Sequence, residues 1–377
     1  MQHGSLARIA CASPPGRGRA VTVPSFDILP FAMKQTANIR FAGRAFLLLL
    51  TSACLSSVQA QDIHFSQFRD WHSTVNPALA GSSGSDIRLA GIQRRQWKSV
   101  PVDYQTVSLC ADGLSGLPTL PDGRTLGWGL LVRQDKAGDG ALQYVQAGAG
   151  LSVSQQIGTA FILRGGLQFL VGQRSVSPHR LTFGSQWNGD VFNAALFSGE
   201  SLRNQTGLIP AAAAGLHLGY QAPGKRTRVD LGTGLHHVNQ PRTNFTDGAT
   251  IRILRRYASY LTATVETGPR TELSGQLLLA FQGTYHETVA GISGTWHLRP
   301  PESTTLAVQA GVGHRWKDAV IPSLVLQVGS WRAGFSYDIH TSRFQPATGG
   351  RGAGEVFLEK RIDLVPAPKE FKACPVF

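Results

Sequence analysis

Apolar and polar residues alternate with a period of two along most of the chain after residue 60. In residues 145–154 the odd positions are apolar, and small or polar residues fill the even ones. Residues 162–171, 305–315 and 332–340 repeat this pattern. Successive side chains of a strand point to opposite faces, so each segment predicts a strand with one apolar and one polar face. A length of roughly ten residues is that of a membrane-spanning strand.

The polar face distinguishes between the kinds of β protein. It consists of Gly, Ser, Gln, Arg and His, which is too polar for the packed core of a sandwich and suits the lumen of a membrane barrel. A soluble β-sandwich or β-solenoid is the alternative, but no repeat of about 20–50 residues supports a solenoid. The charged residues expected in the lumen are Arg164, Arg315, Arg332 and Asp338.

Turn signals separate the candidate strands, as at 137–140, 268–270 and 299–301. Counting the strands from Asp86 to Asp363 predicts an all-β fold, a closed antiparallel transmembrane β-barrel of about 14 strands. Pro366 and Pro368 cannot continue a strand. We therefore expect the last strand at about 354–363 and a C-terminal tail at 364–377, with the barrel spanning 86–363.

Composition agrees with this fold. Charged residues make up only 16% of the 377 residues, against about 25% in typical soluble proteins. No stretch after residue 60 approaches the roughly 18 apolar residues of a spanning helix. The formal charge of +13 does not indicate nucleic-acid binding. Residues 1–60 contribute +5 of it, and the other basic residues are scattered singly along the strands and form no patch.

The N-terminal 60 residues have the pattern of a targeting sequence. Lys34, Arg40 and Arg44 precede an apolar core at 45–55, and a small-residue site ends at Ala60. This predicts a signal peptide with Met33 as its start, cleaved after Ala60, and export to the outer membrane. Two alternatives are a lipoprotein signal with lipidated Cys54 and a mitochondrial transit peptide. After cleavage only Cys110 and Cys374 remain, and we expect them to be unpaired, although a disulfide between them stays possible.

Catalytic, metal and cofactor motifs are missing from the sequence of the mature chain. It has no H-x-H, HExxH or CxxC spacing. On a strand, His236 and His237 would point to opposite faces and could not share a metal. Gly-Thr-Gly at 232–234 suggests a place where another part of the backbone approaches closely. We therefore expect no catalytic residue, metal or cofactor, and no enzymatic activity.

The start of the mature chain resembles the PorP/SprF family. The matching motifs are Gln-Asp at 61–62, Phe65-Ser66-Gln67 with Phe68, and Asn76-Pro77-Ala78 before Gly81. Later matches are Arg95-Gln96-Trp97, Tyr104-Gln105-Thr106, Gly127–Leu130 with Asp135 and Gly138, and the ending Cys374-Pro375-Val376-Phe377. Two positions depart from the family pattern: Ile63 replaces a common Pro, and Arg69-Asp70-Trp71 is more charged than usual.

The resemblance implies an outer-membrane component of the type IX secretion system of Bacteroidota, which in some members is linked to gliding motility. Its partners would be machinery subunits, the C-terminal domain of a secreted adhesin and outer-membrane lipid. Residues 61–85 would form an N-terminal segment at the periplasmic side or the barrel mouth, with aromatic anchors and a turn at Asn76-Pro77. A passive outer-membrane channel is the alternative function.

Overall fold

The computed structural model describes residues 62–97, 104–115, 124–138, 142–199, 205–244, 251–299, 305–342, 345 and 349–364. The expected signal peptide and all of the expected C-terminal tail after Leu364, with Cys374 and Pro375, lie outside these residues. Within the described ranges the helices are single 3-10 turns, and none has the length and apolar character of a membrane-spanning helix. The strands account for most of the rest.

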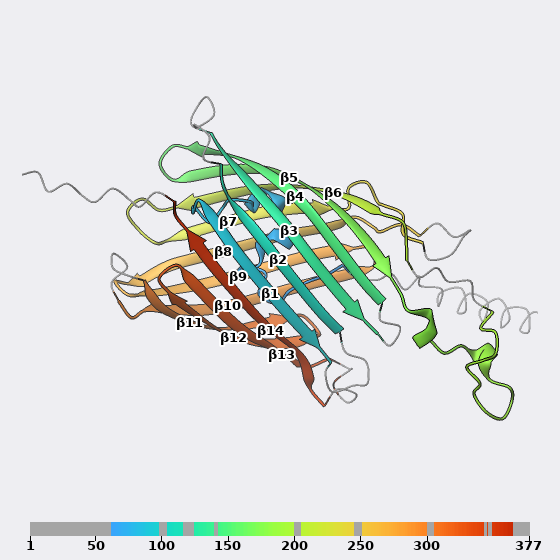
Figure 1. Cartoon of the computed structure of the whole chain (residues 1–377). Helices are drawn as coiled ribbons and strands as arrows, with labels where there is room; N and C mark the ends of the chain where they lie inside the picture. The colour runs from blue at the N-terminus through green and yellow to red at the C-terminus, as the bar shows by residue number, and fades with distance from the viewer. Residues whose placement is uncertain are drawn as a thin grey trace, which may run out of the picture. The chain divides into compact units, whose positions relative to one another are not determined.

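Fourteen antiparallel strands close into a barrel in which neighbours in sequence are neighbours in space, and β1 pairs with β14 (Figure 1). The predicted all-β barrel and its strand number are confirmed. The strands are β1 (Ile87–Gln96), β2 (Tyr104–Leu114), β3 (Thr125–Ala137), β4 (Leu142–Ile157), β5 (Phe161–Ser175), β6 (Ile209–Gln221), β7 (Arg228–His236), β8 (Arg256–Gly268), β9 (Thr271–Gln282), β10 (Tyr285–His297), β11 (Leu306–Arg315), β12 (Ala319–Val328), β13 (Trp331–His340) and β14 (Arg351–Ile362).

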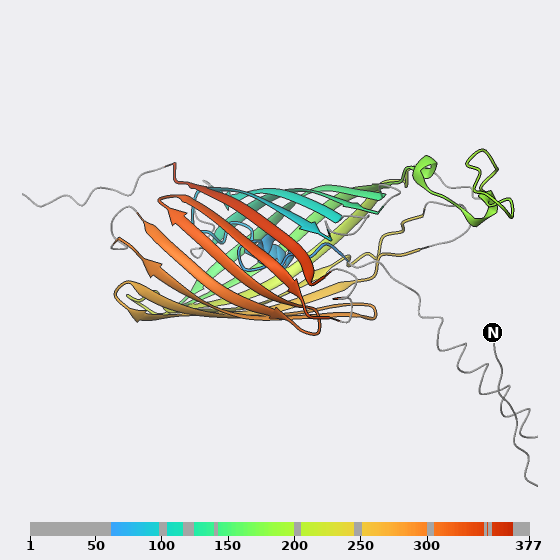
Figure 2. The ribbon, with the colours of Figure 1, turned by 90° about the horizontal axis from the view of Figure 1, so that it is seen from below.

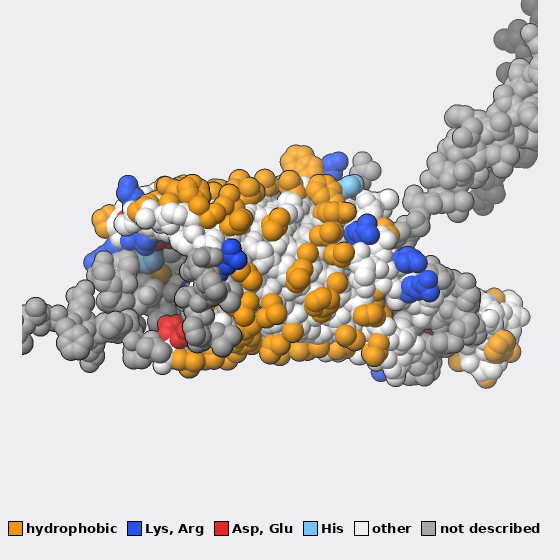
Figure 3. Space-filling model, turned by 90° about the horizontal axis from the view of Figure 1, so that it is seen from above, with side chains coloured by type: hydrophobic (Ala, Val, Ile, Leu, Met, Phe, Trp, Pro, Cys, Tyr) orange, Lys and Arg blue, Asp and Glu red, His pale blue; other side chains and the backbone are white. Residues whose placement is uncertain are grey.

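The outer face of the barrel is apolar, as the alternation predicts. In β4 the odd residues from 145 to 153 are exposed, whereas Gln146, Ser152 and Ser154 are buried on the inner face. Large apolar side chains such as Leu151 and Phe169 are 57% and 66% exposed. Figure 3 shows such side chains over the middle of the wall, with Lys and Arg toward the two ends. An apolar surface of this extent belongs in a membrane and not in water.

The two rims of the barrel differ in their connections. At one rim, which we call the turn end, β1 begins and β14 ends. Its connections range from two-residue turns, such as 269–270 and 329–330, to the ten residues 115–124. At the other rim, the loop end, lie the long connections 176–208 and 237–255. The first of these contains the 3-10 turns η4 (Pro178–Arg180) and η5 (Gly184–Gln186).

Residues 62–86, which we call the luminal segment, lie inside the barrel (Figure 2). They include the 3-10 turns η1 (His72–Thr74) and η2 (Pro77–Leu79). Asp62 contacts Gln282, the last residue of β9, at the loop end. Asp86 leads into β1 at the turn end. The segment therefore runs through the lumen from one end of the barrel to the other, instead of lying at its mouth as the sequence suggested.

Candidate functional site: the luminal segment

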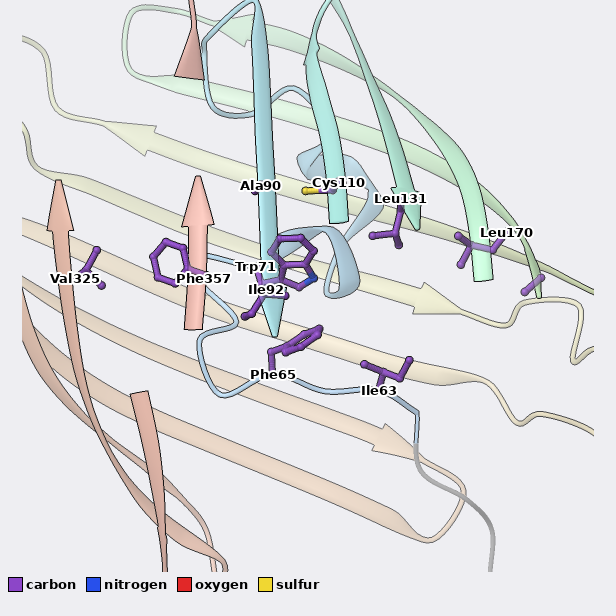
Figure 4. Packing of buried hydrophobic residues seen from close by; sticks show 11 residues of the cluster. Ile63, Phe65, Trp71, Ala90, Ile92, Cys110, Leu131, Leu170, Val325 and Phe357 are labelled. Atoms are coloured by element: carbon purple, nitrogen blue, oxygen red, sulfur yellow. The ribbon is translucent and has the colours of Figure 1, made fainter. Parts of the chain in front are cut away.

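Aromatic side chains of the luminal segment fill the middle of the barrel. Phe65 and Trp71 meet edge to face with their ring centroids 5.9 Å apart (Figure 4). Both are almost fully buried and pack against inward-facing residues from several strands, among them Ile92, Leu131 and Phe357. Burying an aromatic side chain stabilises a fold by roughly 1.5–3 kcal/mol. The apolar core of this protein therefore lies between the segment and the wall.

A second apolar cluster holds the later part of the segment. Phe68, Val75 and Leu79 pack against inward-facing side chains of β8, β9, β10 and β12. These wall residues are mostly small or medium-sized, as Ala258, Ala280 and Ala319 are, and leave room for the larger side chains of the segment. The two clusters together contact nearly all sides of the barrel, so the segment is packed as part of the fold.

The Phe-Ser-Gln motif is held by two carboxylates. Glu355 accepts hydrogen bonds from the backbone amides of Ser66, at 2.7 Å, and Gln67, at 3.0 Å. The Ser66 hydroxyl donates to Asp338 at 2.8 Å. Both carboxylates are fully buried. A buried charge of this kind is stable only if it is paired and hydrogen-bonded, which explains the cations beside it.

Arg94 and Arg315 supply these cations. Arg94 pairs with Asp338 at 2.9 Å and with Glu355 at 2.5 Å. Arg315 pairs with Asp338 at 2.8 Å and with Glu287 at 3.1 Å. Both guanidinium groups also donate to the hydroxyl oxygen of Ser66. Strands β1, β10, β11, β13 and β14 are thus connected through one serine of the luminal segment.

Asp62 anchors the segment at the loop end. Its backbone amide donates to Gln282 at 3.0 Å, and its carboxylate meets His237 at 3.0 Å and Arg133 at 3.6 Å. Burial by itself would raise the pKa of the Asp62 carboxyl, but the charges of Arg133 and His237 outweigh burial and hold this pKa well below its ordinary value. The carboxylate is therefore ionised at neutral pH.

The Asn-Pro-Ala motif forms a tight turn against the wall. Asn76 accepts from the amide of Ala78 at 2.9 Å, which caps η2, and donates to the carbonyl of Leu216 at 2.8 Å. Glycines on the facing strands make room for it. A Cβ at Gly166 would lie 2.6 Å from backbone atoms of Ala78, and a Cβ at Gly234 would lie 2.2 Å from the Val75 carbonyl. The close approach predicted for Gly-Thr-Gly at 232–234 is thus present.

A third set of polar contacts holds the segment near the turn end. The Asp112 carboxylate accepts from the amide of Gly81 at 2.9 Å and pairs with Arg88 at 2.7 Å. Asp70 pairs with Arg332 at 2.8 Å. Each residue of the family motifs from Asp62 to Gly81 is therefore packed or hydrogen-bonded inside the lumen.

The motif residues Arg95, Gln96 and Trp97 lie apart from this segment. Arg95 points outward from β1, and Gln96 accepts from Arg94 at 3.3 Å. Trp97 donates to His340 at 3.0 Å at the loop end. Cys110 is buried and has no disulfide partner among the described residues. Whether it pairs with Cys374 stays a prediction.

Sequence analysis missed the partners that hold the segment. Arg94, Glu355, Glu359, Asp112 and Glu287 were not singled out, although each stands on the polar face of a strand. Their positions on the polar faces, and the presence of both acidic and basic residues on those faces, were the available signal. Their pairing could not be read because it depends on which strands are neighbours and on their register.

One sequence expectation about histidine was wrong. His236 and His237 do not point to opposite faces, because β7 ends at His236 and His237 has a left-handed φ of 53°. Both side chains are buried against the luminal segment, His236 on the carbonyl of Val75 and His237 on Asp62. Within the described ranges, no group of three or more His, Cys, Asp or Glu side chains is arranged to hold a metal ion.

Comparison with known proteins points to one family. The model of the family described as type IX secretion system membrane protein PorP/SprF matches residues 57–356. No curated protein sequence matches the chain. The match covers the luminal segment and the barrel as far as β14.

Solved structures of other barrels are similar in outline. The toluene transporter TbuX of Ralstonia pickettii has 8% identity and a TM-score of 0.46, over 76% of this chain and 92% of that one. The toluene transporter TodX of Pseudomonas putida has 10% identity and a TM-score of 0.41, over 75% of this chain and 90% of that one. The β domain of the Bordetella autotransporter BrkA has 12% identity and a TM-score of 0.39, over 74% of this chain and 99% of that one. Similarity at this level says nothing of function.

Proposed function

Because this chain belongs to the PorP/SprF family of type IX secretion system membrane proteins, we propose that it is an outer-membrane component of that system and assists the secretion or surface anchoring of large adhesin-type cargo. The observation that carries the proposal is the filled lumen. The motif segment that resembles the family is built into the core of the barrel, where its apolar side chains pack against the wall. Such a barrel suits a fixed platform better than a pore.

The orientation of the platform follows from its two rims. Outer-membrane barrels have short periplasmic turns and longer extracellular loops. We therefore take the turn end to face the periplasm and the loop end to face the outside. Trp296 and Trp331 are exposed near the turn end and Trp316 near the loop end. Aromatic side chains at these two heights suit the two membrane interfaces.

This orientation gives each kind of partner its own surface. Machinery subunits on the periplasmic side would meet the turn end. A cargo domain outside the cell would meet the loop end, where the connection 176–208 exposes Trp187, Phe192 and Phe197. Exposed aromatic side chains at a rim are typical of protein interfaces. The cargo that best fits the family is the C-terminal domain of an adhesin.

A passive channel is the rival function, and the polar inner face of the barrel is the feature that favours it. The contacts of Ser66 with Glu355, Asp338, Arg94 and Arg315 argue against it, because they hold the segment inside the lumen. Enzymatic activity has less support still. The Ser66 hydroxyl is buried, and the Asp338 carboxylate that accepts from it is paired with both Arg94 and Arg315, which makes this carboxylate a weak base.

The test is a deletion strain complemented with the wild-type gene or with a variant that lacks the exposed aromatic side chains of 176–208. We expect deletion to abolish surface display of an adhesin, measured by whole-cell labelling, while uptake of small solutes is unchanged. The loop variant should insert in the membrane at normal levels yet restore display poorly. Normal display in the deletion strain would rule out the secretion role.

A further inference from the structure

A cavity of about 310 Å³ lies between the luminal segment and the barrel wall near the turn end. The segment contributes one side of it through Phe68, Arg69, Asp70 and His72, and inward-facing residues of β1, β6–β12 and the ends of β13 and β14 contribute the other. The volume is roughly that of ten water molecules, at about 30 Å³ each. A solute of comparable size would fit, whereas a folded partner would not.

Arginine and carboxylate side chains line this cavity, and almost all of them are paired. Asp70 holds Arg332, Asp230 holds Arg228, and Glu359 holds both Arg88 and Arg361. The fourth carboxylate, Glu272, is paired with His297 at 2.9 Å and with Arg226 at 2.7 Å. Because each acid is neutralised by a cation, these carboxylates oppose the entry of an anion only weakly.

Arg69 is the exception. It is mostly buried, and its one hydrogen bond within the described part of the chain runs from Nη2 to the hydroxyl of Thr264 at 3.0 Å. No carboxylate of the described residues lies within ion-pair distance of it. Burial lowers the pKa of the Arg69 guanidinium; Asp70 opposes this effect, and Arg332 lowers the pKa further. An arginine has five N–H donors, so most of those on Arg69 have no acceptor among the described residues.

The surroundings of Arg69 suit an oxygen anion. Thr262, Thr295 and Gln327 line the same cavity, and their side chains make no hydrogen bond to another described residue. A planar guanidinium recognises carboxylate and phosphate through two parallel hydrogen bonds.

We infer that this cavity, the Arg69 cavity, is a binding site for a small oxyanion with a carboxylate or phosphate group, and that Arg69 is its main contact. The ligand enters from the turn end, replaces water around the guanidinium and takes further hydrogen bonds from the neighbouring hydroxyl and amide groups. The site is separate from the loop end and does not depend on the secretion role proposed above.

The experiment is a titration of the purified full-length barrel in detergent with inorganic phosphate or succinate at constant ionic strength, followed by calorimetry and thermal unfolding. We expect saturable binding and a rise in Tm for the wild type. Arg69→Gln should weaken binding at least about tenfold, and Arg69→Lys should bind with intermediate affinity. Arg255→Gln, which removes an exposed arginine at the loop end, is the matched control and should bind like the wild type.

Thermal unfolding without ligand distinguishes a loss of binding from a folding defect in the variant. Without ligand, Arg69→Gln should unfold at the same or a higher temperature than the wild type, because it removes a buried charge that lacks an acidic partner. Saturable binding by Arg69→Gln with wild-type affinity would overturn the inference. So would the absence of binding by the wild type up to about 10 mM of both anions, or equal effects of chloride, phosphate and succinate.

Discussion

Arg94 of the first strand and Glu355 of the last strand face each other in register across the seam that closes the barrel, 2.5 Å apart. The same Glu355 carboxylate binds the backbone amides of Ser66 and Gln67. Closure of the barrel and docking of the luminal segment therefore use one carboxylate. The site is complete only when the first strand, the last strand and the segment are all in place.

Glu355→Gln tests this shared role. The substitution removes a buried negative charge beside Arg94, and loss of one member of a buried pair costs roughly 3–5 kcal/mol. We expect a decrease of that size in the free energy of unfolding, measured by denaturant titration in detergent or lipid. The amides of Ser66 and Gln67 should also exchange their hydrogens faster.

Glu266→Gln is the control for that experiment. Glu266 pairs with Arg226 at 3.5 Å at the turn end, where both side chains are more than a quarter exposed. An exposed pair contributes at most about 1 kcal/mol. If both variants lose the same stability, the contacts of Glu355 with Arg94 and with the amides of Ser66 and Gln67 have no special role.

Glycine at position 166 allows the Asn-Pro-Ala turn to approach β5. In Gly166→Ala the new methyl group would lie 2.6 Å from the Cα and N of Ala78, so the turn must move. We expect a loss of roughly 1–3 kcal/mol and faster proteolysis between η1 and η2. Gly275→Ala is the matched control on the outer face, since its Cβ meets nothing within 4 Å. Equal behaviour of the two variants would mean that the turn is not held against β5.

Lowering the pH should decrease the free energy of unfolding through protonation of His64 in the luminal segment. Burial lowers the pKa of His64 from 6.5 to about 4, although nearby Glu287 opposes the shift. The folded form therefore disfavours the protonated ring, so this stability is complete above pH 6.5 and decreases as the pH falls toward 4. The decrease is about 3 kcal/mol at most, at 1.36 kcal/mol for each pKa unit.

Unfolding midpoints measured between pH 7.5 and 4.5 test this expectation. The lower limit avoids protonation of Asp62, whose pKa is held below its ordinary value. His64→Gln should flatten the dependence, and part of the remaining slope should come from His72, whose pKa burial also lowers. An unchanged slope in His64→Gln would contradict the assignment.

The sequence predicted the barrel because its signal is local. Alternation in β4, β5, β11 and β13 assigns each side chain to the outer face of the wall or to the lumen, and this requires no knowledge of which strands are neighbours. The location of residues 62–86 was not predictable in the same way. Phe65, Phe68 and Trp71 have no strand period, and their apolar character suits a lipid interface as well as a filled lumen. The acidic partners of Ser66 come from residues about 270 and 290 positions away, which only the strand register brings together.

Ion conduction separates a fixed platform from a passive channel. In planar bilayers the wild-type barrel should conduct little, because the segment and its two apolar clusters occupy the lumen. The double variant Glu355→Gln with Asp338→Asn removes the charge of Asp338, which Arg94 and Arg315 share, and that of Glu355, which pairs with Arg94. The segment should then leave its site more often, and stepwise openings should become frequent. Glu266→Gln should behave as the wild type does. Stable steps of equal size in the wild type and the double variant would mean that ions pass while the segment stays docked, which would favour the passive channel.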